Sequence, residues 1–423
     1  MRILVCGASG FIGRALSGGL RAAGHEIVRG IRRPETAGDI PIDYAVDTDP
    51  MVWEPRLAGI DAVVNAVGII TEHPGATFEN LHARAPIALF EACARSDVRR
   101  VLQLSALGVE TGDTGYFRTK RAADHALMHS ALHWQVLRPS LVYGDTGVSA
   151  SAFRILASLP LIPIPSLPGS AVFQPVHVDD LVAAAVALLD SRTPAGQCIE
   201  CVGATRHTLR GMVSGYREAF RLAPALWVTV PATVVAIAAR IVGSIPGVVL
   251  NPETWRMLQQ GSAGNPDALV RLLGRKPKEL AEFMTQADAE RLRARAMSAW
   301  QLPLCRAALA AVWVLSAIVS AFLYPRSASF HLLSQVGLTG VSATAALYGA
   351  STLDFALGLA TLLYPRRITW ITQALLVAGY SLLIAVALPQ WLLHPFGPIL
   401  KNLPILAILA VLLAEEPAWS TSR

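Results

Sequence analysis

The chain has 423 residues, of which 53% are hydrophobic and only 16% are charged, and its formal net charge is +6. An average soluble domain carries about 25% charged residues, so the chain is depleted in charge, and its high apolar content excludes a mainly disordered protein. The net positive charge divides equally between residues 1–300 and 301–423 and forms no basic stripe, so we expect no nucleic-acid partner.

Short β-branched runs alternate with helical stretches over the first 300 residues. We expect strands at 3–6, 26–29, 62–66, 100–104 and 135–138. We expect helices that begin near Phe11, Asn80, Lys120 and Asp180. Strands separated by crossover helices predict an α/β fold with a Rossmann-like, doubly wound parallel sheet.

A glycine motif directly follows the first expected strand. Gly7, Gly10 and Gly13 have the spacing G-x-x-G-x-x-G between that strand and the first helix. Gly7 permits a tight turn, Gly10 lets backbone N–H groups approach a pyrophosphate, and Gly13 lets the helix lie close to the strand. The helix N-terminus adds about half a positive charge facing the phosphates. The motif therefore predicts a dinucleotide-binding site.

The residues at the end of the second strand indicate whether NAD(H) or NADP(H) binds. An NAD enzyme places Asp or Glu there to bind the ribose 2′-hydroxyl. Residues 27–33 instead contain no acid and include Arg29, Arg32 and Arg33. Because guanidinium groups suit a 2′-phosphate, the sequence favours NADP(H) over NAD(H). The alternative is that these arginines are solvated surface residues.

Tyr116 and Lys120 stand at the start of an expected helix, and Ser105 ends a strand before them. Residues i and i+4 share one face of a helix, so the Lys120 ammonium can lie beside the Tyr116 phenol. A neighbouring cation favours the phenolate, which should lower the pKa of Tyr116 and make it an acid or base near neutral pH. We assign Tyr116 as acid/base, Lys120 as its pKa modulator and Ser105 as the group that orients a carbonyl oxygen.

The middle of the chain indicates a second, smaller part of the fold. Residues 159–169 are rich in Pro and Gly and predict a loop into a small, irregular substrate subdomain. Asp179 and Asp180 precede an apolar stretch, and we expect them to cap a helix, although His177 beside them could touch substrate. We divide residues 1–298 into a nucleotide-binding domain over 1–145 and a second part over 146–298, which completes the fold and contains the substrate subdomain.

Five cysteines form no disulfide framework, which suits a reducing compartment. Cys198 and Cys201 form a C-x-x-C, but they lie in an expected strand and no second ligand pair is near. We therefore expect no metal.

The segment 222–239 is uncharged, but Pro224 and Pro231 interrupt it and Arg240 ends it. A helix lying in the membrane interface, or one packed in the subdomain, is favoured over a spanning helix.

Long apolar runs with charges at their ends follow residue 300. A spanning helix needs about 20 apolar residues. We expect a four-helix transmembrane bundle over 299–415, with spans at about 307–324, 342–364, 368–388 and 397–414. The alternative is a buried helical bundle in a soluble protein. Asp354 within the second span is either a functional group or lies near the outer interface.

Arginines indicate the orientation of these spans. They precede the first span at 291, 293, 295 and 306, and they lie between the second and third spans at 366 and 367. Basic loops face the cytoplasm. We therefore expect a multi-pass protein of the inner membrane with its N-terminal domain in the cytoplasm.

Five segments carry a resemblance to a known family. They are GASGFIG at 7–13, LSALG at 104–108, YFRTK at 116–120, LRPSLVYG at 137–144 and FQPVHVDDL at 173–181. Over about residues 1–295 the chain resembles the extended and atypical short-chain dehydrogenase/reductases, and most of all the group with the nucleotide-binding accessory subunit of respiratory complex I. The C-terminal region is similar to the DoxX-like membrane domain in hydropathy and length.

The resemblance implies a set of cofactor-binding residues. It implies that the pyrophosphate is bound by Gly7, Gly10 and Gly13, with Ser9, Phe11 and Ile12 in the same loop. It also implies that Arg32 lies beside the adenosine ribose with Arg33 next to it, Asp47 near the adenine, Ala66, Val67 and Gly68 under the cofactor, Tyr116 and Lys120 at the nicotinamide ribose, and Pro139 and Ser140 near the carboxamide.

Two functions are consistent with these features. The first is a membrane-anchored NAD(P)H-dependent oxidoreductase that acts on a carbonyl or alcohol of a lipophilic substrate, such as a quinone-like or isoprenoid molecule from the lipid bilayer. The second is a non-catalytic nucleotide-binding accessory or assembly protein of a respiratory or ubiquinone-biosynthesis complex, because several relatives in the complex I group bind nucleotide without turnover.

Overall fold

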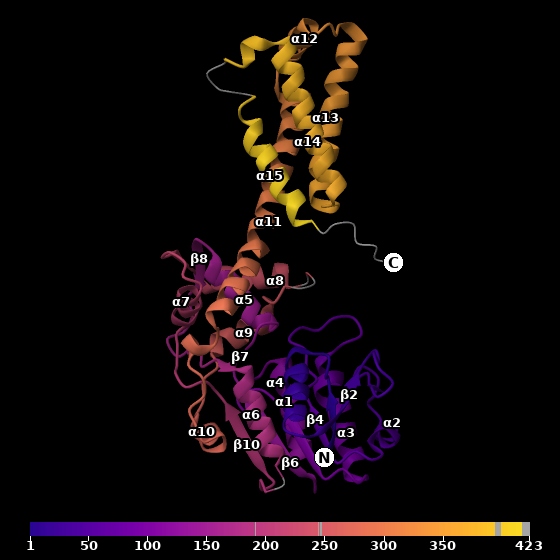
Figure 1. Ribbon diagram of the computed structural model, residues 1–423, viewed down its shortest axis with the longest axis vertical. Coiled ribbons are helices and arrows are strands. Elements are labelled where there is room, and N and C mark those ends of the chain that lie inside the picture. Colours follow the sequence, from indigo (N-terminus) through magenta and orange to yellow (C-terminus); the bar gives the residue numbers. More distant parts are fainter. Residues whose placement is uncertain (191, 244, 246–247, 394–398, 417–423) are drawn as a thin grey trace. The chain divides into compact units, whose positions relative to one another are not determined.

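The computed structural model describes residues 1–190, 192–243, 245, 248–393 and 399–416 (Figure 1). The chain divides into two compact units, Met1–Ala296 (unit 1) and Met297–Arg423 (unit 2).

Unit 1 is built on a seven-stranded sheet in which every neighbouring pair of strands is parallel (Figure 1). The spatial order is β10-β6-β5-β4-β1-β2-β3. The strands are β1 (Arg2–Cys6), β2 (Glu26–Ile31), β3 (Ile40–Pro41), β4 (Ala62–Asn65), β5 (Arg100–Leu104), β6 (His133–Pro139) and β10 (Gln197–Cys201). The predicted α/β parallel fold is therefore confirmed, and the C-x-x-C does lie in a strand.

Helices cover both faces of this sheet, because side chains along each strand alternate between two separate cores. Ile3 and Val5 of β1 pack in a core with Leu16 of α1 and Leu181 of α6. Leu4 packs on the opposite face in a core that includes residues of α2 and α3. These helices are α1 (Phe11–Ala22), α2 (Pro50–Trp53), α3 (Ala85–Ala94), α4 (Gly115–Met128) and α6 (Val178–Leu189), with a π-helical turn at Glu79–Arg84 before α3.

Two helix starts differ from the prediction. Helix α4 begins five residues before Lys120, because the Thr114 hydroxyl accepts the Phe117 N–H at 3.3 Å as an N-cap. The cap of α6 is His177, whose Nδ1 accepts the Asp179 N–H at 3.1 Å, so the predicted capping by Asp179 and Asp180 is wrong. Asp180 is instead buried and pairs with Arg275 at 2.6 Å.

The rest of unit 1 forms small pairs of strands and short helices around an aromatic core that includes Tyr143, Phe173, Tyr216 and Phe283. The strand pairs are β7 (Val142–Tyr143) with β9 (Val176–His177), and β8 (Leu161–Pro165) with β11 (Leu226–Val230). The helices are α5 (Val148–Ser158), α7 (Leu209–Ala219), α8 (Ala232–Val242), α9 (Pro252–Gln260) and α10 (Asp267–Leu273). Helix α8 has 11 residues, too few to span a bilayer that needs about 20.

Unit 2 consists of apolar helices, three of which are long enough to cross a membrane: Gln286–Leu323, which begins in unit 1, Gly340–Leu363 and Arg367–Ala387. They correspond to α11 (Gln286–Ile318) with its π-helical extension, α13 (Gly340–Leu363) and α14 (Arg367–Ala387), and α12 (Arg326–Gln335) lies between the first two in sequence. Helix α15 (Asn402–Glu415) has 14 residues, so a fourth span is not confirmed. Residues 397 and 398 of that predicted span lie outside the described residues.

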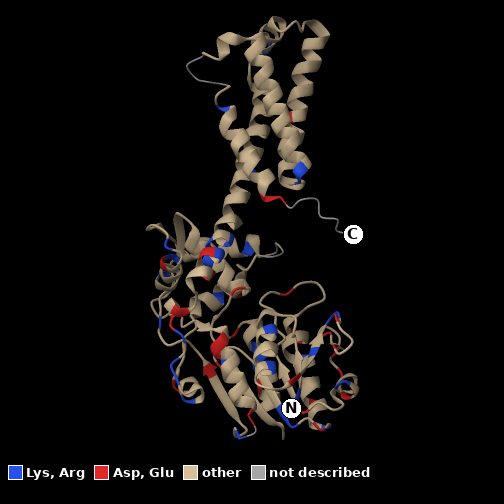
Figure 2. Ribbon diagram, in the orientation of Figure 1, with Lys and Arg blue, Asp and Glu red and all other residues tan. Residues whose placement is uncertain are grey.

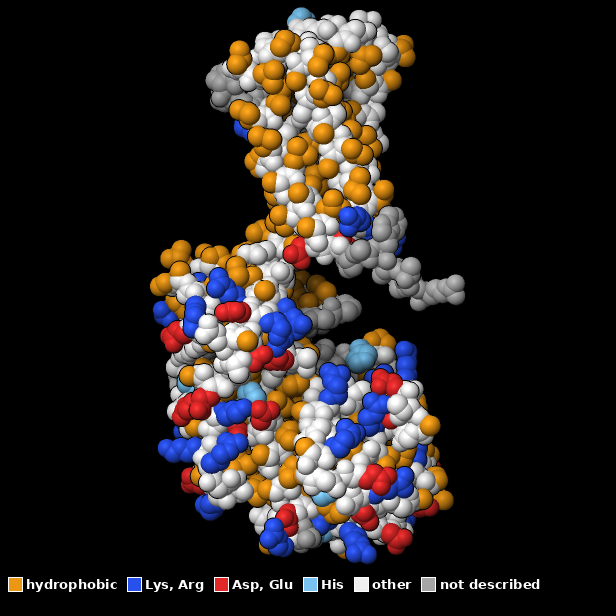
Figure 3. Space-filling model, viewed as in Figure 1, with side chains coloured by type: hydrophobic (Ala, Val, Ile, Leu, Met, Phe, Trp, Pro, Cys, Tyr) orange, Lys and Arg blue, Asp and Glu red, His pale blue; other side chains and the backbone are white. Residues whose placement is uncertain are grey.

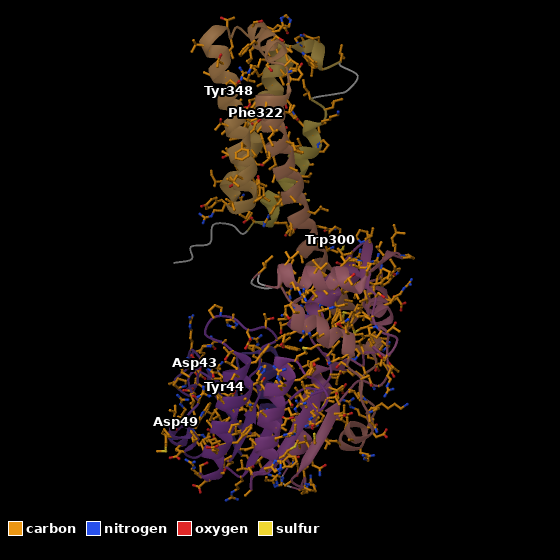
Figure 4. The ribbon with its side chains drawn as sticks, turned by 180° about the vertical axis from the view of Figure 1, so that it is seen from behind. Asp43, Tyr44, Asp49, Trp300, Phe322 and Tyr348 are labelled. Carbon is orange, nitrogen blue, oxygen red and sulfur yellow. The ribbon has the colours of Figure 1, made fainter. Side chains whose placement is uncertain are left out.

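The surface of unit 2 suits a lipid environment. Charged residues are scattered over unit 1 but are sparse along the helices of unit 2 (Figure 2). Hydrophobic side chains cover its visible face (Figure 3), and Phe322 and Tyr348, labelled in Figure 4, belong to this unit. Inside, Gln373 accepts the Trp313 indole N–H and donates to the Thr361 hydroxyl, both at 2.8 Å, which joins α11, α13 and α14.

Candidate active site

The loop between β1 and α1 has the tight geometry that the glycine motif predicts. Gly7 has a φ of +79°, and its carbonyl oxygen accepts the Gly10 N–H at 2.9 Å. A Cβ at Gly13 would lie 2.0 Å from the Gly7 oxygen, so only glycine permits this approach of helix to strand. Among the residues that the structure describes, no side chain caps α1 at Gly10, and Ser9 and Gly10 are exposed. The first amides of α1 are thus open to an anion.

The floor beside this loop is formed by the residues after β4. A Cβ at Gly7 would lie 3.1 Å from Val67 and 3.2 Å from the backbone of Ala66, so the two strand ends are in contact. The chain runs from β1 to β2 on one side of the sheet and returns to β4 on the other, which makes this the topological switch point. Ligands of open parallel sheets bind in the crevice at this place.

Phe11 and Ile12 have packing partners of their own. The Phe11 ring is so close to Gly144 that a Cβ there would lie 2.5 Å from it, and Phe11 also lies beside Gly147. Ile12 packs against the core between the sheet and α6. Both residues hold the start of α1 in place beside the loop.

The three arginines at the end of β2 have different roles. Arg29 is engaged with Asp39, at 2.8 Å for Nε–Oδ1 and 2.6 Å for Nη2–Oδ2, and with Glu35 at 3.0 Å. Arg32 and Arg33 follow the strand and are exposed, and within the described part of the chain neither has an ion-pair partner. These two guanidinium groups are the ones free to meet a phosphate.

Asp47 is buried rather than open to a ligand. Its carboxylate accepts from both Nη atoms of Arg56, at 2.6 and 3.2 Å, and from the Asp43 N–H at 2.6 Å. Asp43 and Tyr44 are labelled in Figure 4, and the Tyr44 hydroxyl donates to Asn65 of β4 at 2.9 Å. Asp47 thus holds the segment after β3 in place, and its contact with an adenine stays a prediction.

Helix α4 brings Tyr116 and Lys120 together as predicted. The Lys120 Nζ lies 5.9 Å from the centre of the Tyr116 ring and donates to the Leu104 carbonyl at 3.0 Å. It also lies beside Gly68, where a Cβ would be 3.4 Å from it. The end of β5, the residues after β4 and α4 therefore converge on one buried ammonium group.

The predicted effect of Lys120 on Tyr116 is wrong for this structure. Burial raises the pKa of Tyr116 to about 12, and Asp124 adds to the increase. Burial lowers the pKa of Lys120 to about 8, although Asp124 opposes this. Burial and the nearby Asp124 carboxylate both disfavour the phenolate, so Tyr116 is a protonated phenol at neutral pH.

Within the described structure, Ser105 makes no hydrogen bond with Tyr116. Its hydroxyl donates to Asp124 at 2.7 Å, and the same carboxylate oxygen accepts from Arg138 at 3.2 and 3.3 Å. All three side chains are buried. The network joins the end of β5 to α4, which carries Tyr116 and Lys120, and to β6.

Pro139 and Ser140, at the end of β6, are held by the backbone of neighbouring segments. The Pro139 carbonyl accepts the Leu107 N–H at 2.9 Å. The Ser140 hydroxyl donates to the Gln174 carbonyl at 2.5 Å, and its N–H donates to the Cys201 carbonyl at 3.0 Å. Their position near a carboxamide stays a prediction.

His82 is a site residue that our sequence analysis missed. It lies on the π-helical turn, is buried, and its Nε2 accepts the Ile69 N–H at 3.0 Å. Its ring stacks on Phe78 with centroids 5.3 Å apart and meets the Tyr116 ring edge-on at 5.2 Å. Burial, together with nearby Lys120, lowers the pKa of His82 to about 2, so it is neutral. Only its position in the fold reveals this role.

Helix α9 covers the other side of Tyr116. The Glu253 carboxylate accepts the backbone N–H groups of Gly115 and Tyr116 at 3.0 and 3.2 Å, and thus caps α4 from 137 residues away. Met257 packs in the small cluster that contains Tyr116 and Phe117. The subdomain therefore contributes directly to the placement of Tyr116.

Comparison with known proteins assigns both parts of the chain. Residues 7–154 match the NAD(P)H-binding family, and residues 310–410 match the DoxX-like family. The chain is 31% identical over 224 residues to a 3-diazoavenalumate denitrifying reductase from Streptomyces sp, covering 45% of this chain and 73% of that protein. It is 28% identical over 291 residues to the mitochondrial NADH dehydrogenase (ubiquinone) 1 alpha subcomplex subunit 9 from Arabidopsis thaliana, covering 63% and 70%.

Solved structures share the fold of unit 1. The NADPH-dependent quinone oxidoreductase QOR2 from Escherichia coli, complexed with NADPH, aligns with a TM-score of 0.53 and 18% identity over 67% of this chain and 98% of that chain. The UDP-glucuronic acid 4-epimerase from Bacillus cereus, in complex with NAD, aligns with a TM-score of 0.52 and 17% identity over 71% and 98%. Both kinds of dinucleotide thus bind to this fold, and the predicted resemblance to a nucleotide-binding family with a DoxX-like domain is confirmed.

Proposed function

Because the chain belongs to the NAD(P)H-binding Rossmann-type family and carries a C-terminal DoxX-like domain, we propose that it is a membrane-anchored reductase of the short-chain dehydrogenase/reductase type. Its substrate would carry a carbonyl group on a lipophilic molecule. The observation that carries this proposal is the pairing of Tyr116 with the buried Lys120 beside the switch-point crevice.

The residues of the crevice fit a dinucleotide. The start of α1 offers amides to a diphosphate, the absence of a Cβ at Gly10 lets them be reached, and glycine at 13 lets the helix lie close to the loop. Lys120, whose Nζ lies beside Gly68, would donate to ribose hydroxyls. A reduced nicotinamide held there would supply a hydride to a carbonyl carbon.

Tyr116 would supply the proton in this direction of reaction. Its pKa of about 12 keeps the phenol protonated at neutral pH, which suits donation to the oxygen of a carbonyl as that carbonyl is reduced. His82 and Phe78 hold the ring from one side, and α9 caps the helix that carries it. Ser105 would reach the substrate only if its hydroxyl left Asp124.

NADP(H) is the cofactor that we propose in preference to NAD(H). The support is that Arg32 and Arg33 remain exposed after β2, while Arg29 is held by Asp39. The substitutions Arg32→Ala and Arg33→Ala should weaken NADPH binding and leave NADH binding nearly unchanged.

The decisive experiment measures NADPH oxidation by the purified full chain with a panel of quinones and aldehydes. We expect Tyr116→Phe to lower kcat by about 10²- to 10⁴-fold and to weaken NADPH binding far less, because the ring is kept and the lost hydroxyl is the proton donor. Tyr364→Phe, at an exposed position of unit 2, is the matched control. An equal, slow background rate for the original chain and Tyr116→Phe would contradict the enzymatic proposal.

The second candidate function is a non-catalytic nucleotide-binding accessory or assembly protein of a respiratory or quinone-biosynthesis complex. One observation favours it: the Ser105 hydroxyl, a candidate catalytic group, is held by a buried carboxylate. The similarity to a complex I subunit of Arabidopsis thaliana agrees with it. NADPH binding without turnover of any carbonyl in the panel is the result that this function predicts.

A further inference from the structure

Strand pair β8–β11 in unit 1 presents apolar side chains to solvent. Along β8, Ile162 and Ile164 are buried, while Leu161 on the alternate side is exposed. Leu161 pairs with Leu226 of β11, which is 71% exposed. Although β8 and β11 are parallel, an exposed strand pair on a soluble protein normally places polar residues on its outer face. The face that carries Leu161, Leu226 and Val228 is instead apolar.

Helix α8, which follows β11, also directs apolar side chains toward solvent. Val234, Ile237 and Ile241 recur at helical spacing and are 50%, 57% and 68% exposed, while Ala239 is the buried residue of this helix. A helix that covers a soluble core would direct this stripe inward. Figure 3 shows hydrophobic side chains gathered on unit 1 where Figure 1 draws β8 and α8.

The charged residues within the segment that carries β11 and α8 are all basic. Residues 221–250 contain Arg221 and Arg240 and no Asp or Glu. Arg210 is exposed and its guanidinium lies 4.8 Å from the ring centre of Trp227 on β11. An apolar stripe with basic residues at its edge matches a membrane surface that contains anionic lipids.

We propose that this surface docks unit 1 onto the lipid bilayer. We call it the docking surface and define it by six residues: Leu161, Leu226, Val228, Val234, Ile237 and Ile241. The chain's own candidate spans hold unit 1 close to a bilayer, so the effective concentration of lipid at this surface is high. A short helix of 11 residues lies in the headgroup region and does not cross it.

Docking would bring the elements that cover Tyr116 close to the interface. Helix α8 packs against α9, and α9 carries Glu253 and Met257, which contact the start of α4 and the Tyr116 cluster. This consequence rests on the proposed function, since it concerns a lipophilic substrate. The docking itself does not depend on catalysis.

The test measures the depth of a fluorophore in the full chain reconstituted into nanodiscs. Native Cys198 and Cys305 are replaced by serine to remove the accessible thiols, and an NBD fluorophore is attached to Ile237→Cys. Val46→Cys, at a 70% exposed apolar position in unit 1 away from the docking surface, is the matched control. The discs contain phosphatidylcholine and phosphatidylglycerol, with or without a nitroxide on the acyl chain.

We expect the nitroxide lipid to quench NBD at residue 237 several-fold more than NBD at residue 46, and Arg240→Glu to reduce that quenching. Equal quenching at the two positions would overturn the proposal. Protection of residue 237 from aqueous iodide without quenching by lipid would also overturn it, because a protein, such as a second copy of this chain, would then cover the surface. Neither readout uses enzymatic activity, so the proposed function and the docking can fail separately.

Discussion

Lys120 is a residue whose charge depends on the fold. Burial lowers its pKa from 10.5 to about 8, so between these two values the unfolded chain binds more protons than the folded chain. Stability then rises with pH in this window, and the destabilising effect of the buried charge is fully present below pH 8.

We therefore expect Lys120→Met to remove a pH-dependent gain in the free energy of unfolding on the order of 2–3 kcal/mol between pH 8 and 10.5. Thermal unfolding of both proteins across this range measures it, with Lys276→Met as the surface control. Parallel stability curves for the original chain and Lys120→Met would show that the ammonium is not desolvated as the structure places it.

His82 anchors the segment after β4 by accepting the Ile69 N–H. In His82→Phe an aromatic ring is kept, but the acceptor of the part-buried Ile69 N–H is lost, and such a hydrogen bond contributes about 0.5–1.5 kcal/mol. We expect faster hydrogen exchange at the Ile69 amide and weaker NADPH binding. His129→Phe, at an exposed position, should change neither quantity. Unaltered exchange at Ile69 would show that His82 only fills space.

At the scale of elements, the contact between β1 and α1 depends on one missing side chain. Gly13→Ala would force a Cβ within 2.0 Å of the Gly7 oxygen, so α1 must move away from the loop. We expect a drop of several degrees in Tm and loss of dinucleotide binding. Gly18→Ala on the same helix meets nothing within 4 Å and should stabilise the protein by about 0.5–1 kcal/mol. Calorimetry with NADPH distinguishes the pair, and retained binding in Gly13→Ala would contradict the assigned role of the loop.

At the scale of the whole molecule, we propose that unit 1 lies in the cytoplasm and that the loop after the first span lies on the opposite side of the inner membrane. The arginines before the first span support this orientation. In bacterial spheroplasts, a membrane-impermeant maleimide should label native Cys198, which is exposed, only after lysis. It should label Ser327→Cys in intact spheroplasts. The reverse pattern would show the opposite orientation.

The sequence by itself determined the parallel sheet, the glycine loop, the shared face of Tyr116 and Lys120, and three of the four apolar segments that we expected to span a membrane. Each of these depends on a short spacing or a local period, which the chain carries without reference to distant residues. The long helices could be predicted without knowledge of tertiary packing, because long apolar runs bounded by charged residues indicate them.

Only the tertiary structure decided the protonation of Tyr116, the partners of Ser105 and Asp47, and the role of His82. These properties depend on burial and on residues that the fold brings close. Ser105 meets Asp124 across 19 positions, and Glu253 reaches the Gly115 amide across 138. The exposure of the apolar stripe on α8 is also a tertiary property. The sequence shows the spacing of its apolar residues, but the packing of the rest of unit 1 decides that they face solvent.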